Sequence, residues 1–569
     1  MKHVTTKNSN NNMNGNSIIN SNNYSNNDKV SLLKDIVCDE IAKVLLSYNI
    51  DEFNYNNYER CRSIVNKVIK DVAAKYSLPT LPKYSDILST LAKYDLNANT
   101  LVRLKRVLLV RPSRSASGVT VISVMPMPYP CPHGRCIYCP GGVEVNIPNS
   151  YTESSPATIV AKRYSYDPYM QIRSKLDTLA YNGHCISKVE LVIVGGTFLF
   201  MPLDYQRWFI KSCYDALNGF RAQTLDQAIE ANENATIRNV GFTVETKPDY
   251  CKKDHVDLML SYGITRVEIG VQALRDSVYK LVNRGHTLQD VVEAFQVARD
   301  AGYKIVVHMM PGLYGSSLEQ DYEDFVMLFK DERFKPDMIK IYPTLVIKGT
   351  PLYELYKRGE YKSYEEEDMI DLIAKVKSIV PRWIRIMRIQ REVDKDEIVA
   401  GIKHGNLRQL ALKRLKEQGL ECKCIRCREA GLKLNGVSID INNVKLVRED
   451  YNASNGKEIF LSYEDEEKDA LFGFLRLRRP SSNAHRKELK DACIVRELHV
   501  YGQAVPLSSR YEWSYQHKGF GRMLMNEAER IAREEFNVSK ILVISAVGTR
   551  EYYRKLGYYN EGPYMAKLL

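Results

Sequence analysis

The sequence lacks any apolar run long enough to cross a bilayer, and its first residues lack the basic and apolar segments of a signal peptide. We therefore expect a cytoplasmic protein with no membrane partner. Residues 1–29 are rich in asparagine and nearly free of large apolar side chains. Such a tail cannot bury enough surface to offset its ordering entropy, and we expect no packed structure there.

Charge of one sign predominates, because 81 lysines and arginines face 69 acidic residues and give a net charge of +12. A basic protein of this kind favours an acidic partner, and nucleic acid is the natural one. Charge alone equally fits a soluble basic protein without such a partner. The chain has 569 residues, which is too long for one ordinary core and predicts several domains.

The N-terminal part, residues 30–95, has the apolar spacing of amphipathic helices. Basic residues follow it, and they form either a solvated face or a surface that contacts the phosphates of tRNA. The candidates are Arg103, Lys105, Arg106, Arg111 and Arg114.

Residues 96–390 alternate strand-like and helix-like runs. This α/β pattern predicts a parallel sheet with helical crossovers, a partial (β/α) barrel with its chemistry at the carboxyl ends of the strands. Six strands are expected, and the repeat is expected to stop after about Pro381. The strands are Gly118–Val124, Lys188–Val194, Asn239–Glu245, Ile264–Gln272, Lys304–Met310 and Met338–Leu345. A cysteine-rich connector, 391–435, and a different α/β domain, 436–569, complete the chain.

Three cysteines follow the first expected strand closely, in the stretch Cys131-Pro-His-Gly-Arg-Cys136-Ile-Tyr-Cys139. Three thiolates on one loop can bind three irons of a 4Fe–4S cluster and leave the fourth iron open. The alternative is a zinc knuckle with His133 as the fourth ligand.

This loop resembles that of the radical S-adenosylmethionine (SAM) superfamily, although four residues rather than three separate its first two cysteines. The resemblance implies that SAM binds the open iron and yields a 5′-deoxyadenosyl radical. It also places SAM contacts at the ends of the following strands. These are Gly195, Gly196, Thr197, Glu245, Gln272 and Met310.

A second cluster, Cys422-Lys-Cys424-Ile-Arg-Cys427, lies in the connector. With His404 it offers a complete set of four ligands for a structural zinc. An auxiliary iron–sulfur cluster is the alternative.

Near the C-terminus, Gln516-His-Lys-Gly-Phe-Gly-Arg522 opens an amphipathic helix. Free backbone N–H groups at a glycine-rich helix start suit a pyrophosphate. The stretch resembles the pyrophosphate loop of the GNAT acetyltransferases, and the strands around it occur in the GNAT order. That resemblance assigns pyrophosphate or arm contacts of acetyl-CoA to Gly519, Phe520, Gly521, Arg522, Glu497, Leu498, His499 and Val500, and places Tyr553 near the thioester.

Both halves in one chain resemble the catalytic subunit family of Elongator, Elongator protein three. Matching stretches run from about Val107 to the last residue. The family implies a tRNA-modifying enzyme in which the radical takes hydrogen from the acetyl group, whose carbon then adds to the wobble uridine in the anticodon region. It also implies an acetyl-CoA contact at Lys188. The cysteine spacing implies an archaeal or bacterial type that works without other Elongator subunits.

Two other classes of function remain open from the sequence. The first is a protein lysine acetyltransferase whose SAM domain is a scaffold, and the second is a non-catalytic RNA-binding subunit.

Overall fold

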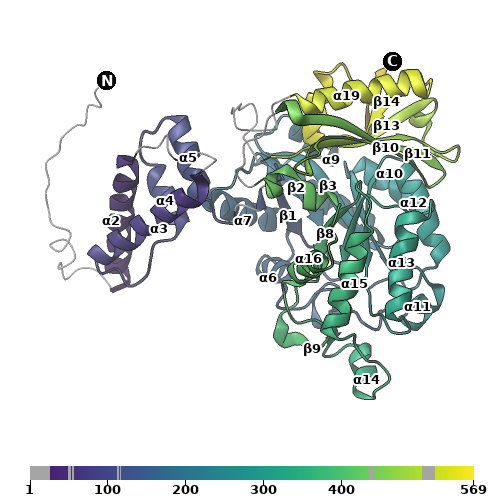
Figure 1. Ribbon diagram of the computed structural model, residues 1–569, viewed down its shortest axis with the longest axis horizontal. Coiled ribbons are helices and arrows are strands. Elements are labelled where there is room, and N and C mark those ends of the chain that lie inside the picture. The colour runs from purple at the N-terminus through teal and green to yellow at the C-terminus, as the bar shows by residue number, and fades with distance from the viewer. Residues whose placement is uncertain are drawn as a thin grey trace. The chain divides into compact units, whose positions relative to one another are not determined.

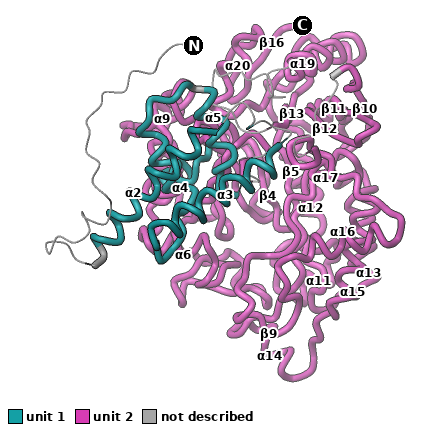
Figure 2. The backbone as a smooth tube through the Cα atoms, turned by 60° about the vertical axis from the view of Figure 1, so that its left-hand side comes forward, with its two compact units in different colours: residues 1–112, 177–184, 436–438 teal, residues 113–176, 185–435, 439–569 magenta. Residues whose placement is uncertain are grey.

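The computed structural model describes residues 26–48, 53, 57–111, 114–115, 117–434, 441–502 and 519–569. The chain forms two compact units (Figure 2): residues 1–112, 177–184 and 436–438, and residues 113–176, 185–435 and 439–569. Most of the asparagine-rich tail and the stretch Gln516–Lys518 lie outside the described residues. Within the described ranges no helix is long and apolar enough to span a membrane.

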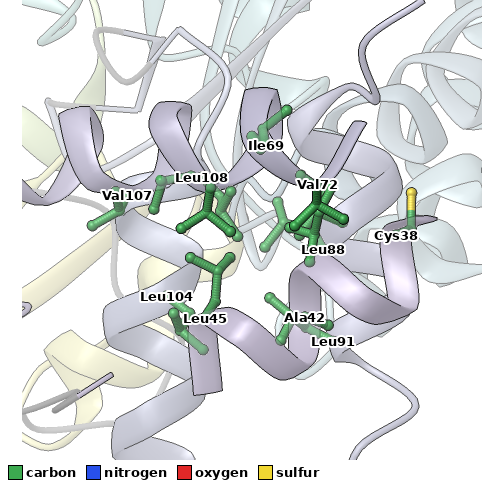
Figure 3. Packing of buried hydrophobic residues seen from close by; sticks show 14 of the residues in the cluster. Cys38, Ala42, Leu45, Ile69, Val72, Leu88, Leu91, Leu104, Val107 and Leu108 are labelled. Carbon is green, nitrogen blue, oxygen red and sulfur yellow. The ribbon is translucent and has the colours of Figure 1, made fainter. Parts of the chain in front are cut away.

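The first unit is built from helices. They are α2 (Asn26–Ser47), α3 (Tyr58–Lys75), α4 (Tyr84–Leu91) and α5 (Ala98–Leu108). Their apolar faces meet in one core, where Leu45, Ile69, Leu88 and Leu104 come from four different helices (Figure 3). The sequence predicted the helical character, and α5 shows in addition that the basic run starts on a helix.

The second unit contains a seven-stranded parallel sheet in the order β1-β2-β3-β4-β5-β6-β8. The strands are β1 (Thr120–Val124), β2 (Lys188–Ile193), β3 (Arg238–Thr246), β4 (Arg266–Gln272), β5 (Lys304–Met309), β6 (Met338–Ile341) and β8 (Arg385–Ile389). β1 and β8 are its edges, so the sheet is the expected partial barrel. The expected end of the repeat at Pro381 is wrong, because β8 follows it.

Helices connect these strands and lie on the outside of the sheet (Figure 1). They are α6 (Pro156–Arg163), α7 (Pro168–Tyr181), α8 (Leu203–Asn218), α9 (Leu225–Asn232), α10 (Lys253–Ser261), α11 (Asp276–Leu281), α12 (Leu288–Asp300), α13 (Leu318–Lys330), α14 (Pro351–Lys357) and α15 (Glu366–Ser378). β7 (Val346–Ile347), which follows β6, pairs with β9 (Ile398–Ala400) of the connector, and the connector continues with α16 (Leu407–Glu417), α17 (Ile425–Arg428) and α18 (Ala430–Lys433).

A second seven-stranded sheet forms the C-terminal part, in the order β10-β11-β12-β13-β14-β16-β15. Its elements are β10 (Val444–Ala453), β11 (Gly456–Asp465), β12 (Ala470–Arg479), β13 (Ala492–Val500), α19 (Phe520–Arg530), β14 (Lys540–Val543), α20 (Arg550–Arg554), β15 (Tyr559–Glu561) and β16 (Tyr564–Leu568). β13 pairs with β14 in parallel only from Ala492 to Val495. Beyond Val495 the two strands diverge, and no strand of the described residues pairs with this side of β13.

Buried ion pairs join the C-terminal sheet to the barrel. Arg496 of β13 lies 2.6 Å from Asp337, which directly precedes β6, and Arg478 of β12 lies 2.6 Å from Asp300 at the end of α12. All four side chains are at most 1% exposed. Removing one member of either pair would leave the other charge buried with fewer partners, so the pairs favour this one arrangement of the two sheets.

Candidate active site: two cavities in one barrel

One cavity, which we name the upper cavity irrespective of the view in Figure 1, lies at the carboxyl ends of the barrel strands. The cysteine loop after β1 lines it together with residues at the ends of β2, β3, β4 and β5. Every SAM contact expected from the sequence lines it except Gly195, whose backbone N–H donates to Glu245 Oε2 at 3.1 Å. These residues are Cys131, Cys136, Cys139, Gly196, Thr197, Glu245, Gln272 and Met310.

The three sulfurs are surrounded by hydrogen-bond donors. Cys131 Sγ accepts from Asn149 Nδ2 at 3.3 Å, and Cys139 Sγ accepts from the Ser150 backbone N–H at 3.1 Å. Burial raises the pKa of the Cys139 thiol to about 11, so the thiolate needs a bound cation to form. This donor set suits metal-bound thiolates.

His133 acts here as a donor to sulfur. Lys247 Nζ lies 2.9 Å from His133 Nδ1, and an ammonium can only donate, so the ring proton is on Nε2. Nε2 in turn lies 3.2 Å from Cys136 Sγ. In this structure His133 therefore donates a hydrogen bond to a cysteine sulfur and does not act as a fourth zinc ligand.

The loop sulfurs are also more widely spread than a single ion requires. Across the described residues, the groups of three ligand atoms that all lie within 4.8 Å of one another are Cys422, Cys424 and Cys427, and Glu245, Glu268 and His308. The loop triad is in neither group. Such a spread fits a cluster in which each sulfur binds its own iron.

The backbone near the upper cavity is shaped for close approach. Gly195 has φ +123°, and a Cβ there would lie 3.2 Å from Pro148 Cβ. Gln272 has φ +73°, and its buried Oε1 has no hydrogen-bond partner in the part of the chain that the structure describes. A buried polar atom without a partner is rare in folded proteins and marks a place where a ligand can bind.

A second cavity, which we name the lower cavity, lies at the opposite end of the same barrel, toward the amino ends of the strands. It is lined by the first residues of the barrel strands, by Glu497, Leu498 and His499 of β13, and by Tyr553 of α20. The β13 residues belong to the stretch that has diverged from β14. The structure therefore brings together the strand expected to hold the acetyl-CoA arm and the tyrosine expected near its thioester.

The remaining residues of the expected acetyl-CoA site lie at the start of α19. Gly519 has φ +87°, and no atom of the described residues lies within 4 Å of a Cβ built there. Phe520 is buried and Arg522 is exposed, whereas Gly521 and Val500 approach each other, because a Cβ on Gly521 would lie 3.7 Å from Val500 Cγ2.

The same strands line both cavities in turn. On β3, Thr243 lines the lower cavity and Glu245 the upper; on β4, Arg266 and Glu268 do the same. On β5, Lys304 lines the lower cavity and His308, four residues later, the upper. At about 3.3 Å per residue, these two levels are about 13 Å apart.

A layer of charged side chains separates the two cavities. Arg266 forms an ion pair with Glu190, and Glu268 with Lys340. His308 Nε2 lies 2.8 Å from Glu268 Oε2. We call these five residues the charged layer. The sequence analysis did not single them out, although alternating charges within the apolar strand Arg-Val-Glu-Ile-Gly-Val-Gln are a signal for an inward-facing polar layer.

Lys188 lies at the first position of β2, on the same face as Glu190 of the lower cavity because strand side chains alternate. Burial lowers the pKa of Lys188.

The second cysteine cluster is compact but lacks its expected fourth member. Lys377 Nζ lies 3.2 Å from Cys422 Sγ and 3.8 Å from Cys427 Sγ. The His404 side chain is 65% exposed and lies 3.5 Å from Glu366. The structure therefore does not bring His404 to the sulfurs, and Lys377 is a buried neighbour that the sequence analysis missed.

Among the basic candidates, Lys105, Arg111 and Arg114 are exposed, and Arg103 and Arg106 are half-buried. The first unit contains all of them except Arg114.

The fold and the upper cavity define a radical SAM protein with a fused GNAT-type domain. The chain matches the radical SAM superfamily over residues 126–328, the radical SAM C-terminal domain over 336–417 and the GNAT acetyltransferase family over 442–558.

Relatives narrow this class. The chain is 47% identical to Elongator complex protein 3 of Danio rerio, over 89% of this chain and 93% of the relative. It is 49% identical to the tRNA uridine(34) acetyltransferase of Methanocaldococcus jannaschii, over 81% and 87%. A solved structure of Methanocaldococcus infernus Elp3, lacking residues 1–46, superimposes with TM-score 0.71 at 46% identity and covers 80% of this chain and 100% of that one. The chain belongs to the Elongator complex protein 3 family.

Proposed function

We propose that this enzyme forms 5-carboxymethyluridine at the wobble position of tRNA from acetyl-CoA, by radical SAM chemistry. The observation that carries the proposal is the pair of cavities in one barrel. One cavity has the cysteines and the strand ends of a radical SAM site, and the other has the open β13 stretch of a GNAT site. The name of the Methanocaldococcus jannaschii relative supports uridine 34 of tRNA as the target.

Cys131, Cys136 and Cys139 would hold a 4Fe–4S cluster, which with SAM and one electron would supply the radical chemistry that removes hydrogen from the acetyl methyl group. The chain's own part is to hold and orient. Asn149 and Ser150 donate to the sulfurs, and Glu245 and Gln272 face the SAM position. The fixed contact between the two sheets keeps the thioester in line with the barrel.

The reaction balances as follows. One C–H bond of the acetyl methyl group breaks, and its carbon forms a bond to C5 of the uridine. C5 then gives up its hydrogen as a proton and one electron, which equals the electron that a low-potential donor supplied. Water finally cleaves the thioester, which leaves a carboxymethyl group and free CoA.

We assign a structural zinc to Cys422, Cys424 and Cys427, whose sulfurs all lie within 4.8 Å of one another. Zinc binds thiolates at about 2.3 Å in tetrahedral geometry, which this spacing suits. The Lys377 ammonium lies next to two of the sulfurs and partly offsets their negative charge. The fourth ligand is then a water or a residue other than His404.

For tRNA we assign phosphate contacts to α5 and the residues after it, namely Arg103, Lys105, Arg106, Arg111 and Arg114. Salt-dependent binding is expected of such contacts. We further propose that the enzyme acts in the cytoplasm, where its cysteines stay reduced, and without other Elongator subunits.

The test is anaerobic reconstitution with iron, sulfide, SAM, a one-electron reductant, tRNA and acetyl-CoA with a deuterated methyl group. We expect 5-carboxymethyluridine in the tRNA digest and deuterium in 5′-deoxyadenosine, both by mass spectrometry. A protein lysine acetyltransferase would instead acetylate protein without SAM and leave the tRNA unmodified, which would overturn the proposal. The complete residue set of the upper cavity disfavours that alternative.

A further inference from the structure

One lysine of the lower cavity differs from every other cation that lines it. Arg266 pairs with Glu190, Arg385 with Glu429, and Arg496 with Asp337. Lys304 opens β5 and lines the same cavity, but it has no carboxylate within 4.0 Å and no side-chain hydrogen bond to any described residue.

The surroundings of Lys304 are charged but do not neutralise it. Burial, together with the charge of Arg266, lowers the pKa of Lys304 to about 8. Glu497, Glu190 and Asp337 act in the opposite direction. These groups come from β4, β13, β2 and the segment before β6, that is, from each side of the cavity. A buried ammonium without a partner is costly, and such groups are concentrated at functional sites.

The thioester of the proposed reaction belongs in this cavity. Glu497, Leu498 and His499 line one side with the open stretch of β13, and Tyr553 lies with them. Lys304 comes from the barrel. A thioester held along β13 would therefore lie between the strand that binds its arm and a lysine from the other domain.

We propose that Lys304 is a catalytic residue that donates a hydrogen bond to the thioester carbonyl oxygen during hydrolysis. The inference rests on the proposed function and names a group for its last step. The oxygen of a water molecule bonds to the carbonyl carbon, and negative charge collects on the carbonyl oxygen. The C–S bond then breaks; one proton of the water goes to the CoA sulfur, and the other leaves as the acid becomes a carboxylate.

A donor aimed at that oxygen acts mainly on the rate. Removing one such donor typically lowers kcat by about 10²–10³-fold, because the charge develops only in the transition state. Lys304→Met should therefore slow hydrolysis by about 10²-fold at nearly unchanged KM for acetyl-CoA. Lys304→Arg keeps a cationic donor and should recover part of the rate.

The experiment uses the complete anaerobic reaction, quenched in hydroxylamine, which converts any uridine still carrying a thioester into a hydroxamate. Wild type should give mainly carboxymethyluridine. The Lys304→Met variant should form 5′-deoxyadenosine at the wild-type rate but yield the hydroxamate instead. Lys330→Met, an exposed residue at the end of α13, is the control and should behave like wild type.

The pH dependence of the hydrolysis rate provides an independent test of the role of Lys304. Hydrolysis needs the ammonium form, so its rate in wild type should fall as pH rises through about 8. The Arg variant should lose this fall, because guanidinium stays charged. Since Lys304 is a buried cation without a partner, Lys304→Met should melt no earlier than wild type.

Two results overturn the inference: carboxymethyluridine formed at the wild-type rate by Lys304→Met, or joint loss of 5′-deoxyadenosine and stability in that variant. If wild type forms neither carboxymethyluridine nor hydroxamate, the proposed function itself fails, and the two failures are thereby distinguished.

Discussion

Gly519 offers the sharpest test of the acetyl-CoA site, because a charged and an uncharged side chain of the same size can be compared at this position. Its φ of +87° is unfavourable for any other residue, at a cost of about 1–2 kcal/mol, yet a Cβ there would meet no atom of the described residues within 4 Å. A larger side chain therefore strains the loop without a clash. The change that matters is Gly519→Glu, which places a carboxylate at the start of α19, where we assign the pyrophosphate.

The magnitude follows from Coulomb's law. At an effective dielectric constant of about 20 and about 8 Å, a carboxylate and one phosphate charge repel by about 2 kcal/mol. Two phosphate charges give about 4 kcal/mol, or a loss of affinity of about 10³-fold. Salt screens such a repulsion, so the loss should shrink at high ionic strength.

The matched control is Gly519→Gln, which has the same size and the same backbone strain but no charge. Calorimetry with acetyl-CoA should show a small loss for the Gln variant and a loss of about 10³-fold for the Glu variant, while tRNA affinity changes in neither. Equal affinities of the two variants for acetyl-CoA would refute the placement of the pyrophosphate at this helix start.

Three further outcomes are expected. Cys136→Ala should lose the bound iron and sulfide after anaerobic reconstitution, and unchanged iron would contradict the cluster assignment. Cys424→Ala should lose zinc by metal analysis and unfold at a lower temperature, since metal binding is coupled to folding; a wild-type protein without zinc would refute this site. Asp337→Asn removes the carboxylate next to Arg496 and Arg476 and leaves Arg496 with Glu458 alone, so it should destabilise the protein by about 3 kcal/mol in denaturant unfolding, whereas exposed Asp450→Asn should cost at most about 1 kcal/mol. Similar losses in these last two variants would contradict the idea that the buried pairs fix the two sheets.

The barrel was predictable where strands are apolar and the helices between them are amphipathic. The expected strands agree with β1 to β6 to within a few residues. β8 was missed because its sequence, Arg-Ile-Met-Arg-Ile, is short and carries two cations. Both cations have roles that depend on the fold: Arg385 pairs with Glu429, and Arg388 lines the upper cavity. Such compensation of charge by distant residues cannot be read from a local pattern.

The candidate sites were likewise predictable where the sequence signal is local, and not where a position depends on the fold. Cysteine spacing and glycine-rich loops are local, and they led to residues that meet in the two cavities. His404 was chosen because it is near in sequence and chemically suitable, but its exposed position beside Glu366 depends on how the connector folds. Lys377, which contacts the second cluster, lies 45 residues before Cys422. Only the packing of the connector against α15 brings such a residue to the sulfurs.

The charged layer fills part of the barrel interior with buried ion pairs. Well-packed apolar side chains would usually fill a barrel interior at equal or lower free energy than buried ion pairs. An apolar plug, however, would close the barrel permanently. In the proposed reaction the acetyl group must advance about 13 Å from the level of Lys304 to that of His308 for hydrogen removal, and it must return, bonded to the uridine, to the level of Lys304 for hydrolysis. The arm of CoA carries amide groups, which can take over the hydrogen bonds of displaced charges as it enters. Until then, the pairs of Arg266 with Glu190 and of Glu268 with Lys340 lie between the lower cavity and the upper cavity. A polar layer thus suits a barrel that must open to one polar chain and stay closed to bulk water at other times.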